Sequence, residues 1–350
     1  MIEFIKMTPP DKDAEAAAKA RFDSIAKPLN SLGLLETSVI RLAGIQGTPD
    51  VNLSKRCAVI FCADNGVVNE GVTQTGSEVT ALVAKEIASG KSNISRMAQL
   101  ANADVFAVDI GMNTNVEGCG IINRKISCGT NSILRGPAMS KSQAEQAILA
   151  GVELVRERRD EGYNIIVSGE MGIGNTTTSS AVAAVLLDRR PIEVTGRGSG
   201  LTNDAYVRKI KVVSAAIAVN QPDRNDPLDI LSKLGGYDIA GMTGMFLGAG
   251  IYHLPVVIDG LISSVAAVLA AKICPDAVNF MFASHVSKEP AGQMLLDLLG
   301  LKPMLHCEMC LGEGTGGVLL LSLIDSALSV YREAHTFEEI SMKPYEDLTK

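Results

Sequence analysis

The chain has 350 residues, of which 47% are hydrophobic, and its formal net charge is −7. An apolar fraction of this size can fill a large core, which excludes disorder as the main state of the chain. The acidic balance, the lack of a basic run and the absence of tryptophan argue against a nucleic-acid partner.

The first fifty residues predict helices and no strand. Residues 11–27 and 34–45 have helical patterns, and the sequence between them, which contains Pro28 and Gly33, interrupts the helix. We therefore expect this leading piece to pack apart from any sheet. Residues 1–10 carry charged side chains without an apolar signal region, and no uncharged apolar run reaches the length of a membrane span. These features predict a soluble, cytoplasmic protein without a membrane partner.

From residue 57 onward, apolar strand patterns alternate with helical patterns. The predicted strands are 57–63, 104–110, 164–167, 255–259 and 278–283. The predicted helices are 78–88, 142–158, 180–187, 203–220, 239–252, 261–272 and 318–330. Continuous apolar strands separated by helices predict an α/β fold with a mostly parallel sheet covered on both faces. The regularly spaced glycines of 239–252 predict close helix packing.

Ligands of parallel sheets bind where the strands end. That rule places several polar or glycine-rich segments at one edge of the sheet. They are Asp64, residues 70–77, Gly111, residues 169–177 and residues 284–290.

The most informative stretch is residues 168–179, a glycine-rich turn between a strand and a helix. Its glycines let the backbone bend, and the first amides of the next helix favour a bound anion such as phosphate. Asn175, Thr176 and Thr177 add side-chain donors or a helix cap. Glu170 would repel phosphate, so we expect it to face a hydroxylated or cationic part of the ligand.

Other interpretations of this stretch stay open on residues alone. Similar turns occur without any ligand, and a P-loop would need a lysine that is absent here. The glycine order differs from the dinucleotide fingerprint, but Glu193, in a strand-like run roughly 20 residues on, stands where a ribose-binding acid is expected. An NAD-dependent oxidoreductase is therefore one alternative.

A second glycine cluster, residues 311–317, contains Glu313 and precedes an apolar helix. A carboxylate in such a place can act as a general base, although acidic residues at helix starts are often explained by the helix dipole alone. Cys307-x-x-Cys310 follows His306, but no second cysteine pair completes a zinc site, so we predict buried thiols and no metal. The odd number of scattered cysteines, seven, is typical of reduced thiols.

Together these stretches resemble one family, the nicotinate-nucleotide–dimethylbenzimidazole phosphoribosyltransferases, over nearly the whole chain. The motifs are Lys27-Pro28 with Ser31-Leu32-Gly33, Ala63-Asp64-Asn65-Gly66, Glu70-Gly71-Val72, Gly169-Glu170-Met171-Gly172-Ile173-Gly174-Asn175-Thr176-Thr177, Ser284-His285 with Glu289-Pro290, and Gly312-Glu313-Gly314-Thr315-Gly316. The resemblance implies a Rossmann-like domain (51–330) and a small helical domain from both chain ends (1–50 and 331–350). It also implies a dimer without a cofactor.

The resemblance further implies transfer of 5-phosphoribose from nicotinate mononucleotide to an aromatic acceptor, with β-to-α inversion and release of nicotinate. It implies that Glu313 is the catalytic base. The nucleotide and phosphate would contact Glu170, Gly172, Ile173, Gly174, Asn175, Thr176, Thr177, Lys209, Ser287 and Gly312. The acceptor would contact Thr75, Val83, Leu311 and Glu313. Without the resemblance, Lys209 would be interpreted as a solvated helix charge.

The chain departs from the family pattern at Gly76, Asn65, Gly292 and Val83. Val83 stands about where benzimidazole-using relatives have a glutamine, which removes one hydrogen-bond partner. We therefore predict a pocket that accepts phenols such as phenol or p-cresol, as in the phenolyl cobamide branch, as well as 5,6-dimethylbenzimidazole. The active form could then be a homodimer or a heterodimer with a related chain, and a non-catalytic nucleotide-binding subunit of such a heterodimer is a second alternative.

Overall fold

The computed structural model describes residues 6–346. Their central feature is a six-stranded sheet in the order β3-β2-β1-β4-β5-β6, in which every paired strand is parallel. The strands are β1 (Arg56–Ala63), β2 (Ala103–Gly111), β3 (Ile122–Asn123), β4 (Ile165–Met171), β5 (Val256–Ile258) and β6 (Met281–Ala283). The strand order reverses between β1 and β4, and this is where ligands of open α/β sheets bind. The predicted α/β class is confirmed.

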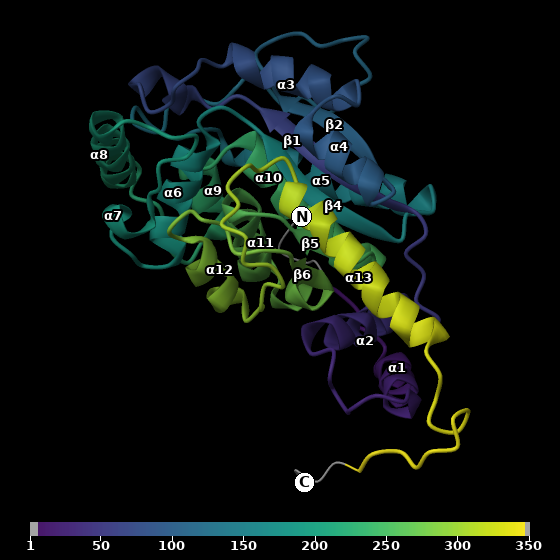
Figure 1. The fold of residues 1–350 in the computed structure, drawn as a ribbon. Helices are drawn as coiled ribbons and strands as arrows, with labels where there is room; N and C mark the ends of the chain where they lie inside the picture. The colour runs from purple at the N-terminus through teal and green to yellow at the C-terminus, as the bar shows by residue number, and fades with distance from the viewer. Residues whose placement is uncertain (1–5, 347–350) are drawn as a thin grey trace.

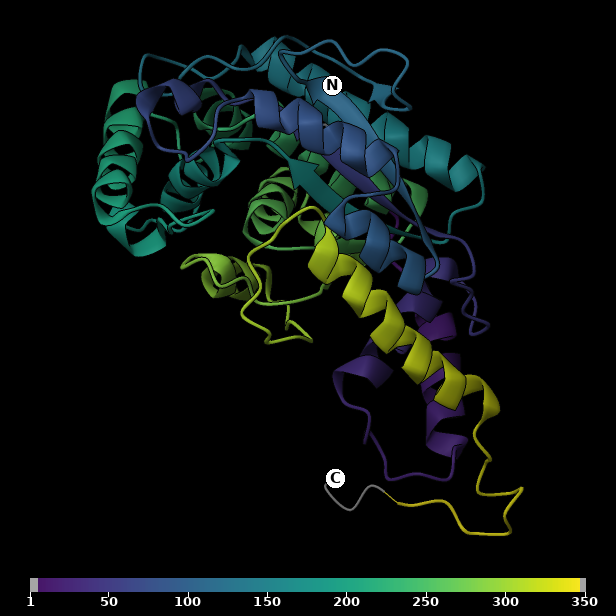
Figure 2. The same ribbon diagram turned by 45° about the horizontal axis from the view of Figure 1, so that its top comes forward.

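Helices cover both faces of the sheet (Figure 1). Neighbouring side chains of β1 show the two faces, because successive residues of a strand point in opposite directions. Phe61 packs against Gly241 of α10 (Tyr237–Tyr252), whereas Ile60 lies next to the loop that carries Glu313. Helices α3 (Glu78–Ala88), α4 (Asn93–Leu100) and α13 (Thr315–Glu333) cover this second face (Figure 2).

The remaining helices lie between and around these layers. They are α5 (Lys141–Asp160), α6 (Asn175–Leu186), α7 (Pro191–Val194), α8 (Asn203–Asn220), α9 (Pro227–Leu234), α11 (Leu261–Ile273), α12 (Gly292–Leu299), and the 3-10 helices η2 (Gly66–Glu70) and η3 (Pro275–Phe280). None of the helices within residues 6–346 combines the length and the apolar character that a membrane crossing requires.

Two helices from the first fifty residues lie beside the far end of α13 (Figure 1). Helices α1 (Lys12–Ser24) and α2 (Leu34–Gln46) pack on each other, and α2 also packs on α13. The rings of Phe22 and Tyr331 lie 4.8 Å apart between centroids, and the Arg21 Nε donates to the Tyr331 carbonyl at 3.1 Å. Residues 1–5 and 347–350 of the predicted small domain lie outside the described residues.

The structure corrects three predicted boundaries. β4 continues through Met171, so the turn is limited to residues 172–174, and α6 begins at Asn175 rather than at residue 180. Residues 278–280 belong to η3 and not to a strand. The strand expected around Glu193 is wrong, because this segment forms α7. Proline is the first residue of both η3 and α7, and its fixed φ favours a helical first turn over an extended start.

The predicted close packing of the glycine-rich helix is confirmed. A Cβ built on Gly244 of α10 would lie 1.9 Å from the Ile148 carbonyl oxygen of α5, and one built on Gly151 would lie 2.0 Å from the Gly241 carbonyl oxygen. Backbone atoms cannot yield as flexible side chains do. The α5–α10 contact therefore requires glycine, which has no side chain, at positions 151 and 244.

We expect Gly244→Ala to lower the free energy of unfolding by roughly 1–3 kcal/mol, because the helices must separate to admit one methyl group. Urea denaturation followed by circular dichroism measures this change. Gln146→Ala, at an exposed position of α5, is the control and should leave stability within about 0.5 kcal/mol. Equal stability of Gly244→Ala and wild type would contradict the packing argument.

Candidate active site

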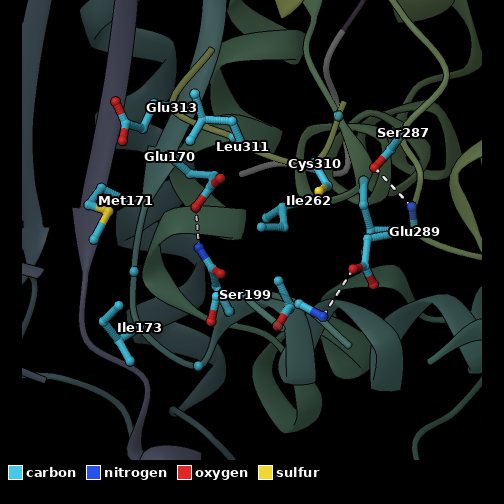
Figure 3. A pocket seen from close by; sticks show the side chains of 18 of the residues that line it. Glu170, Met171, Ile173, Ser199, Ile262, Ser287, Glu289, Cys310, Leu311 and Glu313 are labelled. Carbon is cyan, nitrogen blue, oxygen red and sulfur yellow. Dashed lines mark hydrogen bonds between the residues drawn. The ribbon is translucent and has the colours of Figure 1, made fainter. Parts of the chain in front are cut away.

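A cleft of ≈ 260 Å³ opens beyond the carboxyl ends of β4 and β5 (Figure 3). It is lined by all but one of the predicted site residues. These are Thr75, Val83, Glu170, Gly172, Ile173, Gly174, Asn175, Thr176, Lys209, Ser287, Leu311, Gly312 and Glu313. The exception is Thr177, whose side chain is fully buried and whose hydroxyl has no hydrogen-bond partner. The structure does not bring Thr177 into the cleft.

The turn that begins α6 is shaped by close approach of backbone. A Cβ on Gly172 would lie 2.5 Å from the Ala63 carbonyl oxygen, and Gly174 has a φ of +94°. Gly174 is also the N-cap of α6 and leaves the helix start without a side-chain cap. Of the two roles expected for Asn175, Thr176 and Thr177, the cap is therefore wrong, whereas the side chain of Asn175 is a donor and hydrogen-bonds Glu170. The uncapped start of α6 faces the cleft, where its dipole favours an anion.

Lys209 of α8 lies beside this helix start. Its side chain is 0% exposed, and its Nζ donates to the Thr176 hydroxyl at 2.8 Å. Burial lowers the pKa of Lys209 to about 8, and the charge of Glu289 opposes that shift. A bound phosphate would add a second opposing charge. Lys209 and the start of α6 together therefore form a site suited to an anion.

Glu170, at the end of β4, has a pKa shifted in the direction that favours its protonated form. The pKa of Glu170 is raised to about 8, first by burial and then by the charges of Asp238 and Asp259. A hydrogen bond from the side-chain amide of Asn175 acts in the opposite direction. A neutral carboxyl does not repel phosphate as an ionised one does. Its Oε1 lies so close to Gly312 that a Cβ there would be 2.7 Å away.

Glu313 is held in an unusual backbone conformation at the other glycine cluster. Its φ is +60°, and its neighbours Gly312 and Gly314 have φ values of +83° and +84°. The side chain is 8% exposed, and its Oε2 accepts a hydrogen bond from the Ile94 amide, at the start of α4, at 3.3 Å. The carboxylate thus contacts a helix different from the one that follows it. The helix-dipole interpretation of Glu313 therefore applies to the start of α4 and not to that of α13.

Figure 3 places these groups on opposite sides of the cleft. Glu313, Glu170 and Leu311 lie on one side, and Ser287 and Glu289 lie on the other. Glu289 accepts from the Gly198 amide at 3.0 Å, and a Cβ on Gly198 would lie 3.4 Å from the Lys209 Nζ. Lys209 is therefore on the Glu289 side of the cleft, whereas Asn175, at the start of α6, hydrogen-bonds Glu170 on the side of Glu313.

Comparison with known proteins identifies the family. A family model described as "Phosphoribosyltransferase" matches residues 7–342. A nicotinate-nucleotide–dimethylbenzimidazole phosphoribosyltransferase of Clostridium acetobutylicum is 45% identical, with 97% of this chain and 96% of that protein covered. One of Acetivibrio thermocellus is 44% identical, with 96% and 95% covered. The crystal structure of CobT from Thermus thermophilus is 35% identical, with a TM-score of 0.90 and with 95% of this chain and 100% of that chain covered.

The chain belongs to this phosphoribosyltransferase family. The resemblance drawn from the motifs and the assignment to the pentosyltransferases are confirmed. The structure also removes the residue on which the NAD interpretation relied. Glu193 pairs with Arg190 on α7 at 3.1 Å and is not among the residues that line the cleft.

Asp259 is a site residue of this phosphoribosyltransferase that the sequence analysis missed. It follows β5 and lines the cleft, and its carboxylate accepts hydrogen bonds from the amides of Gly314, Gly316 and Gly317 at 2.8–3.1 Å. Burial raises the pKa of Asp259 to about 7, and these amides oppose the rise. The rule that ligands bind at strand ends could have found Asp259, since the predicted strand 255–259 ends there. The loop residues Arg197, Gly198 and Ser199 also line the cleft and were not predicted.

One further expectation about the cleft's surroundings needs correction. Cys307 and Cys310 are both exposed instead of buried, and Cys310 lines the cleft. Asp64 and Gly111 lie at the carboxyl edge of the sheet as predicted, joined by a backbone hydrogen bond of 3.0 Å, but they do not line the cleft. Among the described residues, no group of three or more His, Cys, Asp or Glu side chains is arranged to hold a metal ion.

The raised pKa of Glu170 predicts a pH dependence of stability. Between its ordinary pKa of 4.5 and about 8, the folded state keeps a proton that the unfolded chain has released. This component of stability is therefore fully present below pH 4.5 and is lost as the pH rises through about 8. Glu170→Gln removes it, so the variant should gain stability relative to wild type as the pH rises. Urea unfolding at pH 5, 6, 7 and 8 measures the difference, and parallel pH profiles would contradict it.

Proposed function

We propose that this chain transfers 5-phosphoribose from nicotinate mononucleotide to a small aromatic acceptor and releases nicotinate. The product is an α-riboside 5′-phosphate used in the synthesis of a cobamide. The relatives' names supply the donor and the reaction class. The observation that carries the proposal is the cleft itself, which is lined by the uncapped start of α6, by Lys209 near Glu289, and by the carboxylate of Glu313 on the side opposite Glu289.

The donor's phosphate would bind at the start of α6 beside Lys209. A phosphate there is held by a helix dipole and a buried ammonium group, and it would restore the pKa of Lys209 toward its ordinary range. Ser287 lies on the same side of the cleft and would contact the nucleotide. Glu170, with its proton, can donate a hydrogen bond to a ribose hydroxyl.

The reaction requires one base. The bond between the ribose C1 and the pyridinium nitrogen breaks, its electron pair neutralises the ring charge, and nicotinate leaves without needing an acid. A nitrogen or oxygen of the acceptor forms the new bond to C1 and must lose a proton. Glu313 accepts that proton. A phenol has a pKa of ~10, so its proton must move as the bond forms. Attack opposite the leaving ring inverts C1 from β to α, and positioning in a closed cleft supplies much of the rate.

The acceptor side of the cleft combines apolar contacts with few polar ones. Val83 of α3 and Leu311 line it, and Thr75 adds a hydroxyl from the loop before α3. Val83 cannot hydrogen-bond the second nitrogen of a benzimidazole. We therefore include phenol and p-cresol with 5,6-dimethylbenzimidazole as acceptors. The active form is a dimer, either of two copies or of two related chains, and the protein acts in the cytoplasm.

Chromatography of nicotinate mononucleotide with the purified chain and each acceptor tests the reaction. We expect free nicotinate that appears only with an acceptor, and we expect Glu313→Gln to lower kcat by about 10²–10⁴-fold through loss of the base. Glu308→Gln, an exposed acid on the same loop that does not line the cleft, is the control.

Full turnover by Glu313→Gln would mean that another group is the base. Donor binding without nicotinate release would favour the alternative of a non-catalytic subunit. In that case activity should appear when a related chain is added.

Substitution of Val83 tests the acceptor range. Val83→Gln adds one hydrogen-bonding group, so kcat/KM for 5,6-dimethylbenzimidazole should rise roughly tenfold relative to that for phenol. Leu82→Gln, on the exposed side of the same helix, is the matched control and should change neither value. The measurement is competition between 5,6-dimethylbenzimidazole and each phenol. No turnover of either phenol by the wild-type chain would refute the phenolic part of the proposal.

A further inference from the structure

We propose that Asp259 is a positioning residue. It fixes the catalytic carboxylate of Glu313 by accepting hydrogen bonds from the backbone that directly follows Glu313. This inference rests on the proposed function, because it assumes that Glu313 is the base. Asp259 lies at the end of β5, and Glu313 lies 54 positions later, just before α13. The two segments are joined by the carboxylate of Asp259.

The contacts of Asp259 are concentrated on the first turn of α13. Its Oδ2 accepts from the Gly314 amide at 3.1 Å, and its Oδ1 accepts from the Gly316 amide at 2.8 Å and from the Gly317 amide at 3.1 Å. The first amides of a helix have no partner within the helix and need one from outside. Asp259 is 3% exposed, so water does not compete for these bonds.

These bonds hold a backbone that would otherwise relax. Glu313 is a non-glycine residue with a φ of +60°, in the left-handed region that side chains disfavour, between two glycines with positive φ. Such a conformation persists only where the surrounding structure enforces it. The amide of Gly314, which immediately follows Glu313, is fixed by Asp259. Because this backbone is fixed, the side chain of Glu313 keeps its direction toward the backbone amide of Ile94.

Asp259 is itself fixed from the opposite side. Its own amide donates to the Ser263 hydroxyl at 3.1 Å, and its carbonyl accepts from the Ser284 hydroxyl at 3.2 Å. His285 packs so tightly on the start of α13 that a Cβ on Gly316 would lie 1.9 Å from its Nδ1. Asp259 is thus a rigid link between the sheet and the loop of Glu313.

Asp259→Asn tests the link, because it replaces one of the two accepting oxygens by an NH₂ group. An NH₂ group is a donor and cannot accept hydrogen bonds from the backbone N–H groups of α13. Misplacement of a catalytic group by about 1 Å can cost about 10²-fold in rate. We therefore expect kcat to fall by about 10²-fold while KM for nicotinate mononucleotide is unchanged, because neither Lys209 nor the start of α6 hydrogen-bonds to Asp259. Asp226→Asn is the matched control, since Asp226 accepts from the first amides of α9 at 3.0 Å and does not line the cleft.

A double-mutant cycle separates positioning from a general structural effect. If Asp259 acts through Glu313, adding Asp259→Asn to Glu313→Gln should cause no further loss of kcat. Losses that multiply would overturn the proposal, and so would a wild-type kcat for Asp259→Asn. If Glu313→Gln alone keeps full turnover, the assignment of the base fails instead, and the two failures are distinguishable.

A second variant covers the case in which Asp259→Asn does not fold. Gly314→Ala leaves Asp259 unchanged, and its Cβ would meet its nearest neighbour, the Ser168 carbonyl oxygen, at 3.3 Å. It strains the same backbone, because alanine disfavours a φ of +84°. It should reduce kcat in the wild-type background and not in the Glu313→Gln background. Equal losses in both backgrounds would overturn the proposal.

Discussion

The chemistry of this site depends on the burial of ionisable side chains near the point where the strand order reverses. Lys209, Asp259 and Glu170 are 0%, 3% and 8% exposed, respectively. A charge in such surroundings is costly unless partners compensate it. Lys209 is paired with the Thr176 hydroxyl, and Asp259 accepts from three backbone amides. Glu170 accepts from the side-chain amide of Asn175. Burial raises the pKa of both acids, which lessens the negative charge that an anionic ligand would meet, and it lowers the pKa of the lysine.

Most of this site was predictable because its determinants are local in sequence. A glycine-rich turn after an apolar strand specifies both the bend and the helix start, and parallel strands bring their ends to one edge. The residues of the first glycine cluster, and the segment 284–290 that contains Ser287, were located on that basis. Lys209 and the site roles of the second glycine cluster required the family resemblance, because a lysine on a helix and an acid before a helix carry no specific local signal.

The parts that sequence analysis missed depend on where elements meet. The role of Asp259 comes from contact between the end of β5 and the start of α13, which no local pattern records. Thr176 and Thr177 are neighbours on α6, yet only Thr176 faces the cleft, because successive helix residues point about 100° apart. The orientation could be assigned only once the helix was known to begin at Asn175. Ile192 and Val194 resembled a strand, but Pro191 starts a helical turn there instead.

The two sides of the cleft are built from different material, and this bears on how acceptor choice can vary. The anion side is made largely of main chain, where a Cβ on Gly172 would collide with the Ala63 carbonyl oxygen and with Asp238. The acceptor side is made of side chains from separate segments, including Val83 and Leu311. A substitution at Val83 changes one contact and leaves the backbone unchanged. Under the proposed function, acceptor preference can therefore change by single substitutions, whereas the donor side tolerates few.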